Sequence, residues 1–348
     1  MYQVLTHLAP CTLHLAPRTR IGLVGIGALG CLFASRLTAV SGVEVVMLGH
    51  WPEQLMALRQ RGLIVEELDG SRTTHLIEVT NQPTAVRPVD IALILVKSYQ
   101  TRTAAQETAQ WLKPHGLAIT LQNGLGNREI LAEALGAERV AVGTTSQGAT
   151  VVAPGVVRHA GEADSYLEEG AAVLAPFLRQ AGFTTHVTAG SHGVQGVIWG
   201  KLAINAGINP LTALVRQPNG YLAENPHAER LARAAASEAA AVAQAQGIAL
   251  PYGYAQAGQQ VIDICRATAV NRSSMLQDVS RGARTEIEAI TGQIVAHGRG
   301  FGVPTPANNI LLRFMRVYEE YRLAKYPTHA IPVANLIQLY EEESRAFT

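Results

Sequence analysis

Residues 21–30 read Ile-Gly-Leu-Val-Gly-Ile-Gly-Ala-Leu-Gly, and this stretch contains a G-x-G-x-x-G motif at Gly25, Gly27 and Gly30. In a strand–turn–helix unit, the first glycine of such a motif makes a tight turn and the second lets the backbone approach a pyrophosphate. The third lets the helix pack closely against the strand, so that the helix N-terminus faces the phosphates. The motif predicts a dinucleotide-binding loop, although a glycine-rich structural turn has the same spacing.

The flanking sequence supplies the context that the motif needs. Residues 21–24 form a short apolar run typical of a strand, residues 28–39 have helical periodicity, and residues 43–48 form a second apolar run. A motif between two strands and ahead of a helix is more specific than the motif alone. We therefore expect six consecutive residues to contact the cofactor: Gly25, Ile26, Gly27, Ala28, Leu29 and Gly30.

Strands and helices alternate through the first half of the chain. The unbroken apolar run 90–96 is typical of a parallel strand that is buried on both faces. Residues 63–65 and 74–79 are expected to form an inserted hairpin around the turn signal Asp69-Gly70. Further strands are expected at residues 117–121, 140–143, 155–157 and 184–187. This pattern predicts an α/β dinucleotide-binding domain of the Rossmann type, with a mostly parallel, doubly wound sheet.

The sequence changes character near residue 190. Later residues carry long helical patterns rich in Ala, Glu, Gln and Arg, such as 229–246, 254–268 and 285–297, and almost no strand signal. The run Gly190-Ser191-His192-Gly193 suits a hinge between two domains. We therefore predict an N-terminal extension at 1–19, a dinucleotide-binding domain at 20–190 and an all-helical substrate and catalytic domain at 191–348.

Composition limits the classes of function. The chain has 348 residues and a formal net charge of +1, which gives no broad attraction to nucleic acid or to an anionic membrane. No apolar run approaches the length of a membrane span. The cysteines Cys11, Cys31 and Cys265 have neither metal-site nor disulfide spacing, so we expect free thiols in a cytoplasmic protein without a metal site. The sequence leaves the oligomeric state open, with a homodimer among the options.

Polar residues follow two strands at the edge where parallel sheets bind their ligands. Lys97 directly follows the strand that ends at residue 96. Asn123, in the run Gln122-Asn123-Gly124, follows the strand that ends at residue 121. Each residue also has a simpler interpretation, Lys97 as a solvated charge at a strand end and Asn123 as a turn or capping residue.

The helical half has polar positions of its own. Lys201, Asn205 and Asn209 recur every four residues and so share one face of a helix. Pro210 disfavours helical geometry at the residue before it, so we expect Asn209 at the end of that helix. A solvated helix face is the simpler interpretation of Lys201, although its apolar neighbours favour partial burial.

Two further runs complete the candidate site. Ser274 lies in Ser273-Ser274-Met275-Leu276-Gln277-Asp278, and Glu286 lies in Arg284-Thr285-Glu286-Ile287-Glu288. A serine at this position can also serve as the N-cap of the helix that follows. Glu286 can equally be an ordinary surface carboxylate, since Glu288 is only two residues away.

In their order and spacing these motifs resemble those of 2-dehydropantoate 2-reductase, also called ketopantoate reductase. The resemblance extends from Arg20 to about Arg322, and residues 199–213, Trp-Gly-Lys-Leu-Ala-Ile-Asn-Ala-Gly-Ile-Asn-Pro-Leu-Thr-Ala, resemble the family's catalytic helix most specifically. Members of this family reduce the ketone of 2-dehydropantoate to (R)-pantoate with NADPH, a step of pantothenate and coenzyme A biosynthesis. The resemblance implies an NADP-dependent oxidoreductase of a small 2-oxo acid.

The residue types suit this chemistry. Hydride arriving at a ketone leaves negative charge on the oxygen, which a lysine ammonium can protonate or stabilise, and we assign this role of general acid to Lys201. The resemblance implies the same role, and implies that Glu286 accepts a hydrogen bond from the terminal hydroxyl of the substrate and orients Lys201. It also implies substrate binding by Asn123, Asn205, Asn209 and Ser274, and cofactor contacts from Lys97 and Asn123.

One position departs from the family pattern. The second strand ends in Met47-Leu48-Gly49-His50-Trp51, where the family commonly has a basic residue that holds the 2′-phosphate of NADPH. His50 can contact that phosphate only as a weaker, pH-dependent partner. The acidic residue that usually binds the ribose of NAD is also missing here, so NADP is favoured.

Three functions are compatible with these observations. The leading hypothesis is ketopantoate reductase. The second is a paralogous NAD(P)H-dependent reductase of another 2-oxo acid, and the third is a non-catalytic nucleotide-sensing protein on the same fold. The full set of lysine, asparagine, serine and glutamate residues argues against the third, because a sensor does not need all of them.

Overall fold

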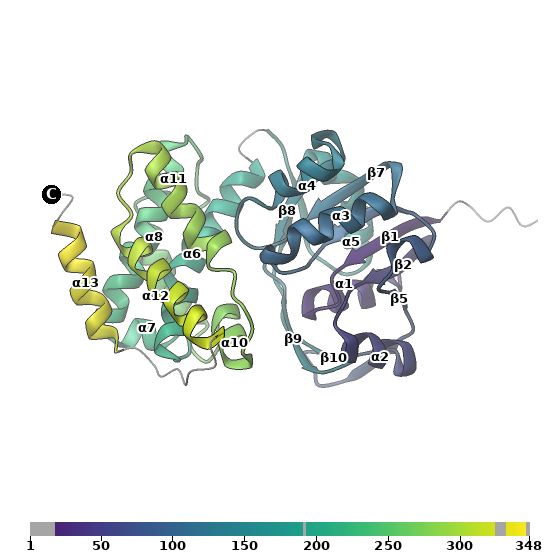
Figure 1. The fold of residues 1–348 in the computed structure, drawn as a ribbon, viewed down its shortest axis with the longest axis horizontal. Helices are drawn as coiled ribbons and strands as arrows, with labels where there is room; N and C mark the ends of the chain where they lie inside the picture. Colours follow the sequence, from purple (N-terminus) through teal and green to yellow (C-terminus); the bar gives the residue numbers. More distant parts are fainter. Residues whose placement is uncertain (1–17, 191–192, 324–331, 346–348) are drawn as a thin grey trace, which may run out of the picture.

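The computed structural model describes residues 18–190, 193–323 and 332–345. Most of the expected extension at 1–19, Cys11 and the central residues of the expected hinge, Ser191 and His192, lie outside these ranges. Strands lie at one side of the molecule and the helices that follow residue 193 lie at the other (Figure 1). The described part of the second half contains helices and no strand, as the sequence predicted.

The larger sheet has eight strands in the order β12-β11-β8-β7-β6-β1-β2-β5. These strands are β1 Thr19–Val24, β2 Val43–Leu48, β5 Glu78–Thr80, β6 Val89–Ile94, β7 Leu112–Thr120, β8 Val140–Thr145, β11 Ser165–Glu168 and β12 Thr185–Thr188. Every neighbouring pair is parallel except β8 and β11. The strand order reverses between β1 and β6, so a crevice for a ligand is expected at the carboxyl ends of these two strands.

Helices cover both faces of this sheet because its central strands are apolar on both faces. Ile21 and Leu23 of β1 belong to the core that contains α1 (Ala28–Leu37), whereas Val24 belongs to the core that contains α3 (Thr101–Trp111). A Cβ atom at Gly22 would lie 2.5 Å from the ring of Trp111, so only glycine leaves room for that ring. The remaining α-helices of this half are α2 (Pro52–Arg61), α4 (Asn127–Leu135) and α5 (Ala175–Gln180).

A second, four-stranded sheet has the order β4-β3-β10-β9, with β3 Leu63–Glu66, β4 Arg72–His75, β9 Gly148–Ala153 and β10 Val156–Gly161. β3 and β4 form the expected antiparallel hairpin. The prediction of one strand over 74–79 is wrong, because residues 74–75 end β4 and residues 78–79 belong to β5 of the larger sheet. The two residues that cross between the sheets, Leu76 and Ile77, are apolar and carry no turn signal, so the sequence does not mark the break.

The helical half is built around α6 (Gly193–Val215), which packs closely on α8 (Pro226–Ala245). A Cβ atom at Gly207 of α6 would lie 2.7 Å from the carbonyl oxygen of Ala232, so small residues set the approach of these two helices. The other α-helices are α7 (Tyr221–Glu224), α9 (Ala257–Ala267), α10 (Ser274–Arg281), α11 (Gln293–Phe301), α12 (Pro306–Leu323) and α13 (Val333–Arg345).

Two helix boundaries differ from the sequence-based expectation. Asn209 does not end its helix, because α6 continues through Pro210 to Val215. Burial on all sides outweighs the local preference of the proline, and the Thr212 hydroxyl donates to the carbonyl oxygens of Ile208 (2.8 Å) and Asn209 (3.1 Å). The helix expected over 285–297 begins only with a π-helical turn at Glu288–Gly292, which continues into α11.

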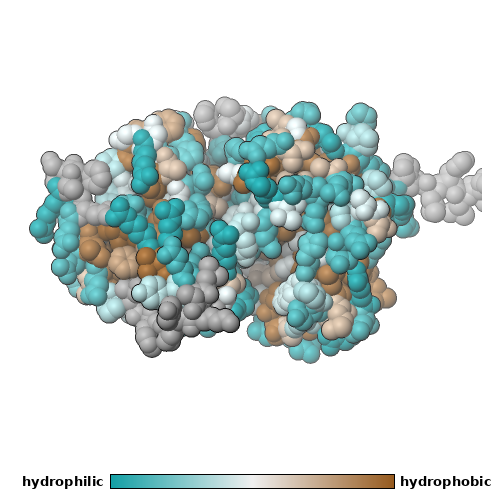
Figure 2. Space-filling view, viewed as in Figure 1, coloured by the Kyte–Doolittle hydropathy of each residue, from teal (hydrophilic) through white to brown (hydrophobic). Residues whose placement is uncertain are grey.

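One face of the molecule is largely hydrophilic (Figure 2), and the two cysteines in the described ranges are buried. Hydrophilic residues cover much of the face shown in Figure 2, and hydrophobic residues gather in smaller patches. Within the described ranges no helix is long and apolar enough to cross a membrane, and no cluster of three His, Cys, Asp or Glu side chains could hold a metal. Cys31 and Cys265 are free and buried, and burial raises the pKa of their thiols to about 12 and about 11.

Candidate active site

The loop between β1 and α1 has the backbone that a pyrophosphate cradle requires. Gly25 has a φ of +123°, and a Cβ atom at Gly30 would lie 1.9 Å from the carbonyl oxygen of Gly25. Gly27 caps the N-terminus of α1, and a Cβ atom there would meet nothing within 4 Å. A side chain would therefore be strained at Gly25 and crowded at Gly30. The loop is open at Gly27, where a phosphate can reach the helix N-terminus.

Lys97 joins the two halves of the chain. It follows β6, and its Nζ lies 2.6 Å from Asp278 Oδ2 and 3.5 Å from Glu286 Oε2, both carboxylates of the helical half. The Lys97 side chain is 31% exposed, whereas that of Asp278 is only 2% exposed. Burial alone would lower the pKa of the Lys97 ammonium, but the two carboxylates outweigh it and raise that pKa above its usual value. Lys97 is therefore held as a cation.

Glu286 is the residue on which the polar contacts converge. Its carboxylate accepts hydrogen bonds from the backbone N–H of Ser98 (3.0 Å) and from the side-chain amide of Asn123 (3.4 Å), besides the contact with Lys97. Glu288 points elsewhere and pairs with Arg316 at 2.6 Å on the surface. Glu286 is only 5% exposed, so it is not an ordinary surface carboxylate.

The loop after β7 positions Asn123 against this carboxylate. Gly124 has a φ of +83°, and a Cβ atom there would lie 2.4 Å from the carbonyl oxygen of Ala289 in the π-helical turn. The backbone N–H of Leu125 donates to the same carbonyl at 2.9 Å. Asn123 is thus more than a turn residue, because the close approach at Gly124 brings its amide to Glu286. Widened π turns are frequent at functional sites.

Lys201 approaches from α6. Its Nζ donates to the backbone carbonyl of Thr145, at the end of β8. Burial lowers the pKa of the Lys201 ammonium from 10.5 to about 8, although attraction to Glu286 acts in the opposite direction. Glu286 therefore lies close enough to act electrostatically on Lys201 while it contacts Lys97 directly. A lysine with a pKa near 8 can donate a proton at neutral pH and regain it.

Of the other two candidate residues of α6, Asn209 contacts α10. The Asn209 amide donates to the Ser274 hydroxyl at 3.4 Å. Ser273, not Ser274, caps α10, because its hydroxyl accepts the backbone N–H of Leu276 at 3.0 Å. Ser274 is therefore free of the capping role that the sequence left open. Asn205 is partly exposed, and no other residue within the described ranges hydrogen-bonds to its side chain.

His50 lies apart from this cluster. Its Nε2 is 2.5 Å from a carboxylate oxygen of Glu107 in α3, and its side chain is 52% exposed. The end of β2 nevertheless packs on the glycine loop: a Cβ atom at Gly49 would lie 2.5 Å from Ile26, and the Gln54 amide donates to the Ile26 carbonyl at 3.0 Å. His50 is thus beside the cofactor loop, but a carboxylate already faces its ring.

Comparison with known proteins identifies the family. The model named Ketopantoate reductase PanE/ApbA matches residues 21–172, and the model of the C-terminal domain of the same family matches residues 193–319. The chain belongs to the ketopantoate reductase family.

Relatives of this reductase family cover nearly all of the chain. The 2-dehydropantoate 2-reductases of Halobacterium salinarum and Archaeoglobus fulgidus are 36% and 37% identical, and each alignment covers 86% of this chain and 98% of the relative. The crystal structure of a family member from Ralstonia eutropha has a TM-score of 0.80 at 30% identity, covering 88% of this chain and 100% of that one. D-mandelate dehydrogenase in complex with NADH and anilino(oxo)acetate shares the fold, with a TM-score of 0.79 at 24% identity over 88% of this chain and 100% of that one.

Sequence reasoning missed three groups of this candidate site. Asp278 was part of a quoted run but received no role, and its burial against Lys97 follows only from the docking of α10. The backbone N–H of Ser98 and the carbonyl of Thr145 also contact candidate residues. Backbone groups carry no side-chain signal, so no sequence pattern could have identified them.

Proposed function

We propose that this protein reduces 2-dehydropantoate to (R)-pantoate with NADPH, a cytoplasmic step towards pantothenate and coenzyme A. In this proposal, residues 20–190 bind the cofactor and residues 191–348 supply the general acid. One observation carries it: Lys201, with a pKa lowered to about 8, stands within electrostatic reach of Glu286, which also contacts Lys97 and Asn123. The substrate is inferred from the relatives that are 2-dehydropantoate 2-reductases.

Lys201 and Lys97 have different roles in this proposal, one as proton donor and the other as a fixed positive charge. When bound in the glycine loop, NADPH supplies the hydride. Lys201 gives its Nζ proton to the ketone oxygen as charge develops there, which removes the cost of a buried alkoxide. Lys97 keeps its charge and attracts the anionic groups of cofactor and substrate.

Glu286 and the amides select the substrate in this scheme. Glu286 accepts a hydrogen bond from the terminal hydroxyl of 2-dehydropantoate and holds Lys201 by its charge. Asn205, Asn209 and Ser274 bind the carboxylate and carbonyl oxygens without adding charge. Asn123 stands between substrate and cofactor, because its loop follows β7 at the carboxyl edge of the sheet.

A second candidate is a reductase of another 2-oxo acid. The fold of D-mandelate dehydrogenase, which has been described with NADH, matches this chain closely, so the fold alone does not select 2-dehydropantoate or NADPH. A nucleotide sensor without catalysis is a weaker candidate, since a lysine with a lowered pKa is typical of a proton-transfer site and serves no purpose in a sensor.

An assay of NADPH absorbance with a panel of 2-oxo acids distinguishes these functions. The panel contains 2-dehydropantoate, 2-oxoisovalerate and phenylglyoxylate, each with NADPH and with NADH. We expect the highest kcat/KM for 2-dehydropantoate with NADPH. A higher value for another acid supports the second candidate, equal or better turnover with NADH contradicts the choice of NADPH, and no oxidation with any acid supports the sensor.

A further inference from the structure

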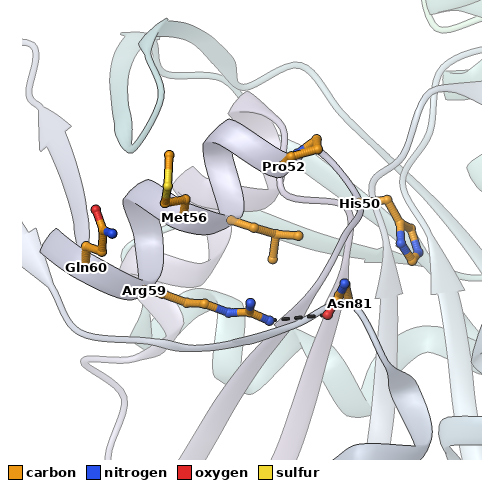
Figure 3. Close-up of a pocket in the computed structure, with 7 residues that line it drawn as sticks. His50, Pro52, Met56, Arg59, Gln60 and Asn81 are labelled. Atoms are coloured by element: carbon orange, nitrogen blue, oxygen red, sulfur yellow. Dashed lines mark hydrogen bonds between the residues drawn. The ribbon is translucent and has the colours of Figure 1, made fainter.

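A cavity of about 450 Å³ lies between α2 and the loop that follows β5 (Figure 3). Pro52, Leu55 and Met56 supply apolar wall, and His50, Arg59 and Asn81 supply polar groups. Figure 3 shows the Arg59 side chain extending toward Asn81, with His50 beyond it. No carboxylate is among the described residues that line the cavity, so it is suited to an anion.

The cavity lies beside the glycine loop. It starts at the end of β2, where Gly49 packs on Ile26 and Gln54 binds the Ile26 carbonyl. In a dinucleotide-binding fold the adenine ribose lies at the end of the second strand. A substituent on that ribose would therefore lie near the cavity, which has His50 and Pro52, just after β2, among its lining residues.

Arg59 is the arginine that lines this cavity, and its guanidinium can bind an anion there. Its Nη2 donates to Asn81 Oδ1 at 3.3 Å, and among the described residues no carboxylate pairs with it. His50 differs, because a carboxylate oxygen of Glu107 lies 2.5 Å from its Nε2, so an anion already faces its ring. A second arginine in the last turn of α2, Arg61, donates to the carbonyl of Pro154 at 3.3 Å and does not line the cavity.

We propose that this cavity binds the 2′-phosphate of NADPH and that Arg59, rather than His50, supplies the positive charge that selects it. The inference rests on the proposed use of NADPH. A guanidinium offers two parallel N–H donors to a phosphate, and the Asn81 side chain holds Arg59 in place from the opposite wall. The family's usual basic residue at the end of the second strand is thus replaced by an arginine two turns into the next helix.

Calorimetric titration with cofactor fragments tests this assignment without any 2-oxo acid. The probes are adenosine 2′,5′-bisphosphate and 5′-AMP, which differ only in the 2′-phosphate. The proteins are the wild type, Arg59→Gln, Arg59→Lys, His50→Gln and the matched control Arg61→Gln, each checked for folding by circular dichroism. We expect Arg59→Gln to weaken the bisphosphate by about 10- to 100-fold and to leave 5′-AMP unchanged, the usual scale for a lost charged hydrogen bond.

The other variants sharpen the result. Arg59→Lys should restore part of the affinity, and His50→Gln and Arg61→Gln should change it by less than about threefold. Unchanged bisphosphate affinity in Arg59→Gln, or a selective loss in His50→Gln, overturns the assignment while NADPH use still stands. Equal binding of both probes by the wild type overturns the NADPH proposal and this inference together. Failure to reduce 2-dehydropantoate bears on the substrate alone.

Discussion

Lys97 and Lys201 have the same side chain, but the ammonium of Lys97 contacts carboxylates and that of Lys201 contacts a neutral carbonyl. Lys97 lies in the loop that follows β6 and contacts two buried carboxylates of the helical half, Asp278 and Glu286. Lys201 leaves the middle of α6 and meets a backbone carbonyl of β8. The pKa of Lys97 is raised, whereas burial lowers that of Lys201 to about 8.

The difference shows how one site raises the pKa of one lysine and lowers that of another, although their side chains are identical. A carboxylate in contact stabilises an ammonium, whereas a neutral carbonyl in a dry setting compensates only part of the lost hydration. Glu286 acts on both lysines, but it is in contact with only one of them. The number of carboxylates in contact with each ammonium therefore sets the direction of its pKa shift.

The largest effect is expected from Lys201→Ala. Loss of the general acid should lower kcat by about 10²- to 10⁴-fold, with NADPH affinity nearly unchanged because the glycine loop lies on β1 and α1. Steady-state assays and fluorescence titration measure the two quantities. Lys113→Ala is the control, since Lys113 pairs with Asp90 away from the site. Near-normal turnover in Lys201→Ala would contradict this role and make Lys97 the next candidate for the proton donor.

Glu286→Ala should separate substrates that carry a terminal hydroxyl from those that lack it. The variant should lose about 10- to 100-fold in kcat/KM for 2-dehydropantoate and much less for 2-oxoisovalerate, because only the first offers a hydroxyl to this carboxylate. Glu288→Ala, which removes only the surface pair with Arg316, is the matched control. An equal loss for both substrates means that Glu286 acts only on the lysines.

The pH profile of kcat should distinguish the two lysines by the pH at which kcat begins to fall on the alkaline side (the basic limb). An acid must be protonated to donate, so kcat should be full below a pH of about 8 and fall about tenfold per pH unit above it. The lowered pKa places the limb there rather than near the usual value of 10.5. Profiles of kcat from about pH 6 to about pH 10 measure it. A limb near 10 in the wild type, or its survival in Lys201→Ala, contradicts the assignment.

Asp278→Asn should have the smallest effect, and it should appear in stability. The substitution removes the buried partner of Lys97 and of Arg281, while Glu286 still faces Lys97. Both cations are partly exposed, so the free energy of unfolding should fall by roughly 1–2 kcal/mol. A fully buried ion pair would lose more. Urea unfolding measures it, with Arg281→Gln as the control. Equal stability of the two variants would make the Lys97 pair energetically neutral.

The first half of the chain was the easier to predict, because its signals are local. The strand over residues 43–48 was expected and observed at the same residues, and the glycine loop has the backbone that its spacing predicts. The strand expected over 74–79 was wrong, because neither Leu76 nor Ile77 carries a turn signal where the chain changes sheets. Asn209 was placed at a helix end by a local rule that burial of α6 overrides.

Periodicity and motif spacing act over a few residues, and they were enough to predict the two halves of the fold and the family. Which carboxylate contacts which lysine follows from the folded arrangement alone. Lys97 and Asp278 are 181 residues apart, and Lys201 and Thr145 are 56 apart. Contacts across such distances depend on how α6 and α10 dock on the sheet. Burial and charge partners set a pKa, so the difference between the two lysines exists only once the chain is folded.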